Sequence, residues 1–496
     1  MVLVTSEQMR EFDKRTISTL RVPGIVLMDH AGKALAEAAL AKRPRCVVAL
    51  CGKGNNGGDG WVAARWLRHQ GVNQVQVVST VDVSELTGDA RTAATSAIAA
   101  GVPHQVYAPG QPLPPADVYL DAILGTGAAR PLSGQLADLV SALEAVVAAS
   151  GAWVIAADVP TGVNATTGEV AGPAVRAQQT IAMAAQKLGT AITPGCLYAG
   201  DVVVADVGIG IEPSAELAAF TTAADVRAAL PHRGPQTHKG TYGRVGVLVG
   251  EMTGAAVLAG LGAARAGAGL VMLAGEERVQ GAPLEFVQRL FRDDMASVFA
   301  QSQALVIGPG LGDGGGLPER TARNLLAHWE KPGVLDADGL RLLRQNGALQ
   351  RLPEGQWVLT PHPKECAALL ETSTEAVQAR RLEAATRLAR ETGGVVILKG
   401  YRSIIAHPDG RVRVNATGNA ALATAGTGDV LAGIVGGLLA QGADSFLAAC
   451  AGAFLHGAAG ELAGERLTLV STLASDVVDA IPDAIGKAFH ADLEEQ

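Results

Sequence analysis

The 496-residue sequence predicts an α/β protein with two doubly wound, three-layer domains. Short apolar runs alternate with helix-period stretches in two separate series along the chain, and such alternation is typical of parallel sheets with helices on both faces. A stretch rich in Pro, Gly and polar residues, 230–240, separates the two series. We therefore place the boundary between 210 and 235 and expect domains at 1–212 and 225–496.

The individual elements follow from this periodicity. In the first series we expect strands at 46–51, 74–79, 117–120 and 153–157, and helices at 61–69, 87–100 and 135–149. In the second series we expect strands at 244–249, 269–273, 304–307, 333–336, 357–360 and 395–398. Two further runs, 403–406 and 411–414, flank HPDG, which indicates a hairpin. The final third is rich in small residues and is expected to be helical.

Composition excludes several classes of protein. Lys and Arg number 40 against 48 Asp and Glu, giving a net charge of −8, so the basic surface of a nucleic-acid binder is not expected. The longest uncharged apolar stretch, 445–460, is shorter than the about 20 residues that cross a bilayer. The N-terminus is charged where a signal peptide has an apolar core. The five scattered cysteines fit a reducing compartment. We expect a cytoplasmic protein with no nucleic-acid or membrane partner.

A glycine-rich loop, GKGNNGGDG at 52–60, lies between a predicted strand and a predicted helix. It contains the G-x-G-x-x-G pattern that lets a backbone approach a pyrophosphate at a helix N-terminus. Alone the pattern also fits a tight turn without a ligand. Three polar side chains that a dinucleotide fold does not require, Asn55, Asn56 and Asp59, favour a binding site.

Two other predicted strands end in polar residues. DAILGTGAARP (121–131) and DVPTG (158–162) follow strands whose carboxyl ends share one edge of the sheet. Asn56, Asp121 and Thr161 then supply oxygen ligands around one point, as hard cations prefer. The alternative for each aspartate is that it only caps a strand end.

The patterns GxGNNGGDG, DAxxGTG and DxP[ST]GxxATTG resemble the NAD(P)H-hydrate epimerase family over residues 1–212. The resemblance implies a Rossmann-like domain that interconverts the R and S forms of NADHX or NADPHX, the nicotinamide nucleotides hydrated at C6. It implies that Asn56, Asp121 and Thr161 hold a potassium ion, where the family usually has Ser at 161, and that Asp158 is catalytic. The implied substrate-binding residues are Asn55, Asn56, Gly57, Gly58, Asp59, Gly125, Thr126, Gly127, Ala128, Ala129, Arg130, Pro131 and Asp158.

In the second series, NAALATAGTGDVLAG (419–433) leads into a predicted helix. Backbone N–H groups at a helix start bind anions, and Asp429 beside Gly426 and Gly428 suits a base that takes a hydroxyl proton in phosphoryl transfer. The alternative is that Asp429 is only a helix N-cap. His362 and Lys399 follow predicted strands, where they suit a cleft and a phosphate contact respectively.

HKGTYGRV, GAAVLAG, RAGAGLV, GPGLG, TPHPKE, LKG and AGTGDVLAG occur in the order found in the ribokinase-like NAD(P)H-hydrate dehydratase family, which the chain resembles over 225–496. The resemblance implies dehydration of the S-hydrate with ADP and Mg²⁺, giving AMP and phosphate, with Asp429 as base. Departures are Glu251–Met252 in place of Gly-Ser and Ser403 in place of Thr. The implied contacts are Ala256, Gly310, His362 and Asp429 for the hydrate, and Lys399, Gly400, Tyr401, Arg402, Ser403 and Gly428 for the nucleotide.

Three other functions are compatible with part of the sequence. A NAD-dependent dehydrogenase requires an acidic residue about 20 positions beyond the glycine pattern, and Asp82 lies near that distance. A ribokinase-like vitamin or sugar kinase explains the second half, and a non-enzymatic binding module explains the first. The two resemblances together explain both halves as one repair enzyme acting on NADHX or NADPHX, and we expect it to be a homo-oligomer.

Overall fold

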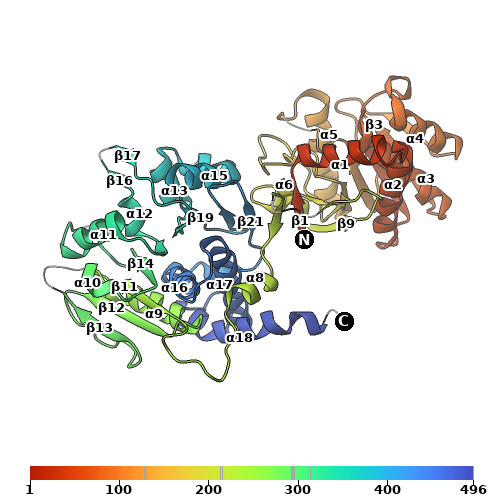
Figure 1. Cartoon of the computed structure of the whole chain (residues 1–496). Helices are drawn as coiled ribbons and strands as arrows, with labels where there is room; N and C mark the ends of the chain where they lie inside the picture. Colours follow the sequence, from red (N-terminus) through yellow and green to blue (C-terminus); the bar gives the residue numbers. More distant parts are fainter. Residues whose placement is uncertain are drawn as a thin grey trace. The chain divides into compact units, whose positions relative to one another are not determined.

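The computed structural model describes residues 1–127, 130–212, 214, 216–291, 296–312, 314–345 and 347–494. The chain divides into two compact units, Met1–Ala218 and Ala219–Gln496, and each is described by itself (Figure 1). Both units are α/β with parallel sheets, which confirms the predicted fold class.

The described part of unit 1 is built on a seven-stranded parallel sheet with the order β4-β3-β2-β5-β6-β7-β9. A separate parallel pair joins β1 to β8. The strands are β1 (Val2–Val4), β2 (Cys46–Cys51), β3 (Gln74–Ser79), β4 (His104–Val106), β5 (Val118–Ala122), β6 (Trp153–Ala157), β7 (Gln179–Met183), β8 (Gln186–Lys187) and β9 (Asp201–Ala205).

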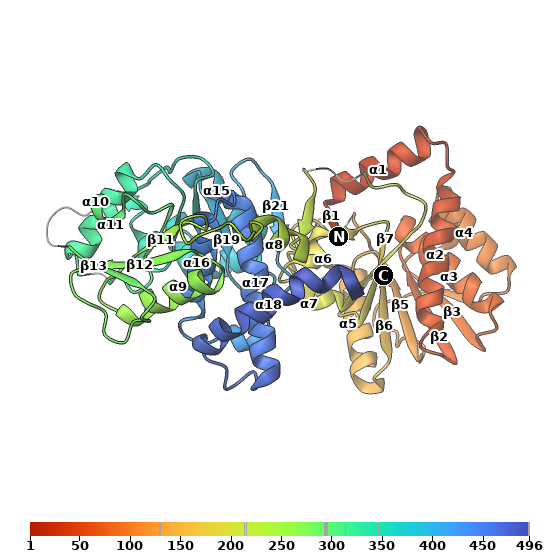
Figure 2. The ribbon, with the colours of Figure 1, turned by 60° about the horizontal axis from the view of Figure 1, so that its bottom comes forward.

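Helices cover both faces of this sheet because its strands alternate apolar side chains between two cores. Val47 and Ala49 of β2 pack with α2, α3 and α4, whereas Val48 and Leu50 pack with α5. Figure 2 shows α5 on the opposite side of the strands from α2, α3 and α4. The helices are α1 (Ser6–Ser18), α2 (Gly24–Leu40), α3 (Asn55–His69), α4 (Gly88–Ala99), α5 (Gly134–Ser150), α6 (Leu188–Ala191) and α7 (Cys196–Ala199), with a 3₁₀ turn at Val83–Glu85.

Helix α3 begins at Asn55, six residues before the expected start at Trp61, so most of the glycine-rich loop is its first turn. A Cβ atom on Gly57 would lie 1.9 Å from the carbonyl oxygen of Gly52. Glycine thus allows the helix to start directly against the end of β2, and helix propensity alone did not indicate this.

The described part of unit 2 has a sheet with the order β13-β12-β11-β14-β15-β18-β19-β20-β21-β10. It is parallel as far as β19, and β20 and β21 form the expected hairpin. Its strands are β10 (Ala218–Phe220), β11 (Arg244–Leu248), β12 (Leu270–Gly275), β13 (Val287–Leu290), β14 (Ala304–Ile307), β15 (Gly333–Leu335), β18 (Trp357–Leu359), β19 (Val395–Leu398), β20 (Ile404–Ala406) and β21 (Val412–Val414), with a small pair β16 (Arg344–Gln345) and β17 (Ala348–Leu349).

One large core joins this sheet to α8, α9 and three apolar helices near the C-terminus. Among the described residues, α17 is long and apolar enough to cross a bilayer, but 67% of that window is buried within the protein, as in a core helix. The helices are α8 (Ala223–Ala229), α9 (Thr253–Arg265), α10 (Ala296–Phe299), α11 (Leu317–His328), α12 (Asp338–Arg341), α13 (Pro363–Leu370), α14 (Thr374–Ala379), α15 (Arg381–Thr392), α16 (Thr427–Ala440), α17 (Ser445–Arg466) and α18 (Ala474–Glu494), with a 3₁₀ turn at Ala420–Leu422.

Candidate functional site

The carboxyl ends of β2 and β5 form the topological switch point of unit 1. The chain leaves β2 towards β3 and β4 and then returns to β5 on the other side of β2, which is where ligands bind in such sheets. A Cβ atom on Gly52 would lie 1.8 Å from the carbonyl oxygen of Ile123. The loops after the two strands are therefore in direct contact, and glycine is required at this point.

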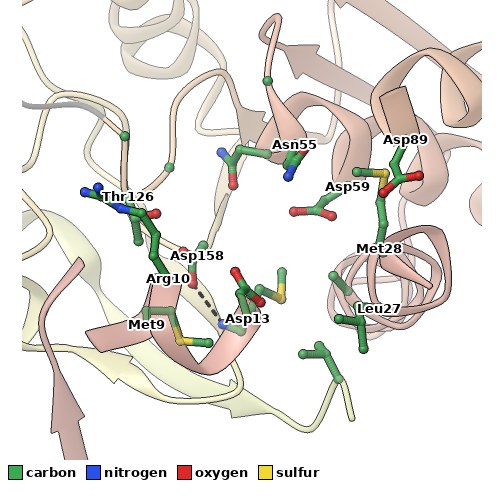
Figure 3. A pocket seen from close by; sticks show the side chains of 18 of the residues that line it. Met9, Arg10, Asp13, Leu27, Met28, Asn55, Asp59, Asp89, Thr126 and Asp158 are labelled. Carbon is green, nitrogen blue, oxygen red and sulfur yellow. Dashed lines mark hydrogen bonds between the residues drawn. The ribbon is translucent and has the colours of Figure 1, made fainter. Parts of the chain in front are cut away.

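A cavity of about 380 Å³ lies at this edge of the sheet. Figure 3 shows side chains from α1, α3 and the loop after β6 around it. Seven of the residues expected to bind the hydrate line it, namely Asn55, Asn56, Asp59, Gly125, Thr126, Gly127 and Asp158.

The other expected residues lie elsewhere. Gly58 packs inside α3 against Met28, and Gly57 packs against Gly52. Arg130 and Pro131 are exposed and are not among the described residues that line the cavity. Ala128 and Ala129 lie outside the described residues.

The central charge pair of this cavity joins Asp158 to Lys187, a residue that the sequence did not single out. Lys187 Nζ donates to Asp158 Oδ1 and to the carbonyl oxygens of Met183 (2.8 Å) and Ala185 (3.1 Å). The Lys187 side chain is fully buried, whereas Asp158 is 13% exposed and lines the cavity. A lysine two residues after the apolar run IAMAA (181–185) is the local signal that could have indicated it.

Three further carboxyl groups line the same cavity, those of Asp13, Asp59 and Asp89 (Figure 3). Burial raises the pKa of Asp59 well above its ordinary value, and the nearby charges of Asp158 and Asp13 add to the effect. Burial also raises the pKa of Asp13. Asp13 and the rest of α1 were not expected at this site, because α1 lies far from the glycine-rich loop in sequence.

The three residues expected to hold potassium do come together. Thr161 Oγ1 donates to Asp121 Oδ1 (2.6 Å), and the Thr161 backbone N–H donates to Asp121 Oδ2 (2.8 Å). A Cβ atom on Gly125 would lie 3.0 Å from Asn56 Oδ1, so Asn56 adjoins the loop after β5. Asn56 Nδ2 is buried and has no hydrogen-bond partner in the described structure. Burial raises the pKa of Asp121 to about 6, against the lowering effect of the Thr161 hydrogen bonds.

In unit 2 the predicted anion site lies at the start of α16. Gly426 is the N-cap, with φ +90°, and Asp429 lies in the first turn without capping the helix. The cap alternative for Asp429 is therefore wrong. Burial raises the pKa of Asp429 to about 6, with a further contribution from the Asp336 carboxylate and an opposing one from Lys399.

A second buried lysine–aspartate pair adjoins this turn. Lys399 Nζ lies 2.7 Å from Asp336 Oδ1, which also accepts from Thr360 Oγ1 (2.7 Å). A Cβ atom on Gly428 would lie 3.3 Å from Lys399 Nζ and 3.7 Å from Asp336 Oδ2. Asp336 was expected only as the end of a strand, so its place in the site was missed. Although burial opposes it, the pKa of Lys399 is raised because Asp336, Glu365 and Asp429 surround the ammonium.

A cavity of about 550 Å³ extends from this pair. Five of the six residues expected to bind the nucleotide line it, namely Lys399, Gly400, Tyr401, Ser403 and Gly428. Arg402 is not among the described residues that line it, and its guanidinium lies over the rings of Phe220 and Tyr401. The rest of the wall comes from β19, the loop 415–423, α16 and α17. The sequence singled out 419–433 among these, but not 415–418 or α17.

The four residues expected to bind the hydrate in unit 2 lie on four different segments, and Asp429 on α16 has been described above. Ala256 is fully buried in α9. Gly310 has φ +64°, and its carbonyl oxygen accepts a hydrogen bond from the Met252 N–H (3.0 Å). This bond holds Glu251–Met252, the pair that departs from the family pattern, against the GPGLG loop. His362 caps α13 through Nδ1, and its side chain is 47% exposed.

Comparison with known proteins places both units in known families. A model described as YjeF-related protein N-terminus matches residues 24–189, and one described as NAD(P)H-hydrate dehydratase matches 245–483. A solved structure of an ADP/ATP-dependent NAD(P)H-hydrate dehydratase from Bacillus subtilis, co-crystallized with ATP/Mg²⁺, is 32% identical, with a TM-score of 0.48, and covers 54% of this chain and 98% of its own.

Relatives of the whole chain are more informative. A bifunctional NAD(P)H-hydrate repair enzyme from Moorella thermoacetica is 37% identical over 97% of this chain and 96% of its own length. One from Escherichia coli is 32% identical over 96% of this chain and 92% of its own. The chain belongs to the family of bifunctional NAD(P)H-hydrate repair enzymes.

Proposed function

We propose that unit 1 interconverts R- and S-NAD(P)HX and that unit 2 dehydrates the S form to NAD(P)H, with ADP converted to AMP and phosphate. The observation that carries this proposal is the pairing of two sites in one chain. Each has a glycine-rich turn beside a buried lysine–aspartate pair, in units that match an epimerase-related model and a dehydratase model. The combination is chemically sound, because a dehydratase specific for the S form leaves the R form unused.

In unit 1 we assign Asp158 as the base that acts on the C6 hydroxyl. Its carboxylate lines the cavity and is paired with Lys187. In this assignment the nucleotide contacts Asn55, Asn56, Asp59 and the loop after β5, because these line the same cavity as Asp158. Figure 3 shows Asn55, Asp59 and Asp158 around that cavity.

The potassium ion belongs to this proposal, and the residues fit it. Asn56, Asp121 and Thr161 form an oxygen-rich set of the kind that hard cations bind. Asn56 Nδ2 is a buried donor without an acceptor, and turning this amide over places its oxygen at the same buried point. A bound cation supplies the positive charge that the buried Asp121 carboxylate lacks. Asp121 and Thr161 also hold the loop after β5 beside the hydrate.

In unit 2 we assign Asp429 as the base that takes the C6 hydroxyl proton while that oxygen accepts phosphate. Hydroxide is a poor leaving group, and phosphorylation makes its departure easy. Lys399 and the N–H groups near Gly428 bind the phosphates, because they lie together at the mouth of the larger cavity. Mg²⁺ accompanies the nucleotide and neutralises phosphate charge. Asp336 Oδ2, which accepts no hydrogen bond in the described structure, suits it.

The test is recovery of absorbance at 340 nm from an R/S mixture of NADHX with Mg²⁺, K⁺ and either ADP or ATP. Full recovery supports both activities and identifies the donor. Recovery that stops at the S fraction contradicts the epimerase assignment, and no recovery contradicts the dehydratase assignment. A phosphorylated product that accumulates supports the vitamin or sugar kinase instead.

The cellular setting is also part of the proposal. The five cysteines are free, which suits a reducing cytoplasm. We retain a homo-oligomer as a prediction, to be measured by light scattering.

A further inference from the structure

Two strained turns face each other across the Asp158–Lys187 pair. Asp158 has φ +68°, and the Val159 N–H donates to the Ala157 carbonyl oxygen (2.8 Å) around it. Ala184 has φ +62°, and the Ala185 N–H donates to the Met183 carbonyl oxygen (2.8 Å). Each is a γ-turn about a non-glycine residue at positive φ, a conformation that is rare and costs about 1–3 kcal/mol. Such strain persists only where surrounding contacts hold it.

Lys187 provides those contacts for both turns at once. Its ammonium has three N–H donors, and the structure gives it three acceptors: Asp158 Oδ1 and the carbonyl oxygens of Met183 and Ala185. The two carbonyls flank Ala184, and the carboxylate belongs to the residue at the centre of the other turn. Because its donors are all used and its side chain is fully buried, Lys187 has none left for a substrate.

The same contacts distinguish the two oxygens of Asp158. Oδ1 accepts from Lys187 and from the Met183 backbone N–H (3.0 Å). Oδ2 accepts no hydrogen bond within the described residues, and Asp158 lines the cavity. The other charged groups around this cavity are Arg10 and Asp13 on α1, Asp59 on α3 and Asp89 on α4. Lys187 is thus the cation bound directly to Asp158, among several acidic neighbours.

We infer that Lys187 is a positioning residue for epimerisation, which holds Asp158 in its strained turn and presents Oδ2 alone to the C6 hydroxyl of the hydrate. The inference rests on the proposed function of unit 1. Oδ2 takes the hydroxyl proton, the C6–O electrons form a carbonyl, and the C6–N1 bond breaks with its electron pair on N1. Oδ2 returns the same proton to N1, giving an open aldehyde. Rotation about C5–C6 and reversal of these steps close the ring on the other face, and Asp158 ends as it began.

The experiment uses the full chain and R-enriched NADHX with ADP, Mg²⁺ and K⁺, so that recovery of absorbance beyond the S fraction reports epimerisation. Lys187→Met is expected to lower the epimerase kcat about 100-fold, within the range for general acid–base catalysis, and to leave KM within about twofold. Lys187→Gln keeps two N–H donors for the carbonyls but lacks the charge. If the methionine variant is unstable, the glutamine variant is used instead, and the same fall in kcat is expected. Arg65→Met removes a different ion pair of unit 1, with Asp29, and is expected to leave kcat unchanged.

A double variant separates positioning from a general structural role. Asp158→Asn is expected to lower kcat by about 10²–10⁴-fold, and adding Lys187→Met or Lys187→Gln is expected to change it by less than about threefold, because the lysine acts only through Asp158. A single Lys187 variant that keeps kcat within threefold overturns the inference. The inference is also overturned if the fall in kcat of the double variant equals the product of the two single falls. It is overturned as well if KM of a single Lys187 variant rises by the same factor as kcat falls. A wild-type chain that fails to recover the R fraction contradicts the proposed function instead.

Discussion

In unit 1, the buried Lys187 pairs with Asp158 beside a second carboxyl, Asp59; in unit 2, Lys399 pairs with Asp336 beside Asp429. Both arrangements lie at the carboxyl ends of parallel strands, and in both burial raises the pKa of the second carboxyl. The lysines differ in what remains available to a ligand. Lys187 also lines a cavity, but its side chain is fully buried and has three protein acceptors. Lys399 is 21% exposed, lines the larger cavity and has Asp336 as its acceptor within the described residues.

The difference indicates two uses of the same ion pair. An ammonium whose three N–H groups all bond to protein, as in Lys187, holds its carboxylate in place, and that carboxylate is the proposed base. A partly exposed ammonium is held in place by its carboxylate and keeps donors for phosphate. In the proposed assignment, the reacting carboxyl group is the paired aspartate in unit 1 and the unpaired one in unit 2. The predictions below test this contrast, from the largest expected effect to the smallest.

Replacing either of the two proposed bases with asparagine is expected to impair one activity and to leave the other unchanged. Asp429→Asn should lower dehydration of the S-hydrate by about 10²–10⁴-fold, because the base for the hydroxyl proton is lost. The same chain should still interconvert R and S, as followed by chromatographic separation of the two forms. Asp158→Asn should do the reverse. If either substitution impairs both activities equally, the two sites are not independent.

Lys399→Met is expected to raise the dehydratase KM for ADP by about 10–100-fold, the range of a lost charged hydrogen bond of about 1.5–3 kcal/mol. This is opposite to Lys187→Met, for which KM is expected to hold. Initial dehydration rates at increasing ADP concentration provide the measurement, and Lys364→Met, at an exposed lysine on α13, is the matched control. An unchanged KM for ADP would show that the exposed ammonium does not bind phosphate.

The pH dependence of dehydration should reflect Asp429. Burial raises its pKa to about 6, and a base must be ionised to act, so the rate should be constant above about pH 7. Below pH 6 it should fall tenfold per unit, because the carboxylate takes up a proton. Rates of S-hydrate consumption between pH 5 and 8 test this. A profile that rises towards acid would assign Asp429 the role of an acid.

Replacing Thr161 tests the oxygen cluster. Thr161→Val removes the hydroxyl that donates to Asp121 Oδ1 and should raise the K⁺ concentration for half-maximal epimerisation by about tenfold, roughly the worth of one hydrogen bond to a charged group. Thr161→Ser keeps the hydroxyl and should match the wild type. A titration of epimerisation rate against KCl distinguishes them. An equal K⁺ dependence of the wild type and both variants would show that this cluster does not bind the potassium ion.

The sequence predicted the central strands of both sheets, but it missed β4, β7 and β9 of unit 1, β10 and β13 of unit 2, and both ion pairs. Runs such as 46–51, 74–79, 153–157, 304–307 and 395–398 match the observed strands, because strands buried on both faces consist of continuous β-branched and apolar residues. The glycine-rich loops were equally visible, since close backbone approach requires glycine.

Lys187 and Asp336 have no such local signature. Their partners lie 29 and 63 residues away in the chain, so no local pattern in the sequence pairs them. Only the return of β7 beside β6 brings Lys187 to Asp158, and only the order of β15, β18 and β19 brings Lys399 to Asp336. The third residue missed, Asp13, reaches the cavity from α1.

The smallest effect expected is on stability, at the second carboxyl of unit 1. Because burial raises the pKa of Asp59, the folded chain holds its proton at pH values where the unfolded chain, with a pKa of about 3.9, has lost it. Above that pH, folding either takes up a proton at Asp59 or buries its charged carboxyl, and this cost fades as the pH falls below about 3.9. Asp59→Asn should therefore stabilise unit 1 by about 1 kcal/mol at pH 7.5, the scale of a typical substitution, and by nothing measurable at pH 3.5. Denaturant unfolding at both pH values checks this, with Asp82→Asn as the control, since hydrogen bonds from Ser84 lower the pKa of that exposed carboxyl. A loss of stability at pH 7.5 would mean that Asp59 is ionised in the folded protein, and the resemblance between Asp59 and Asp429 would then be limited to their position.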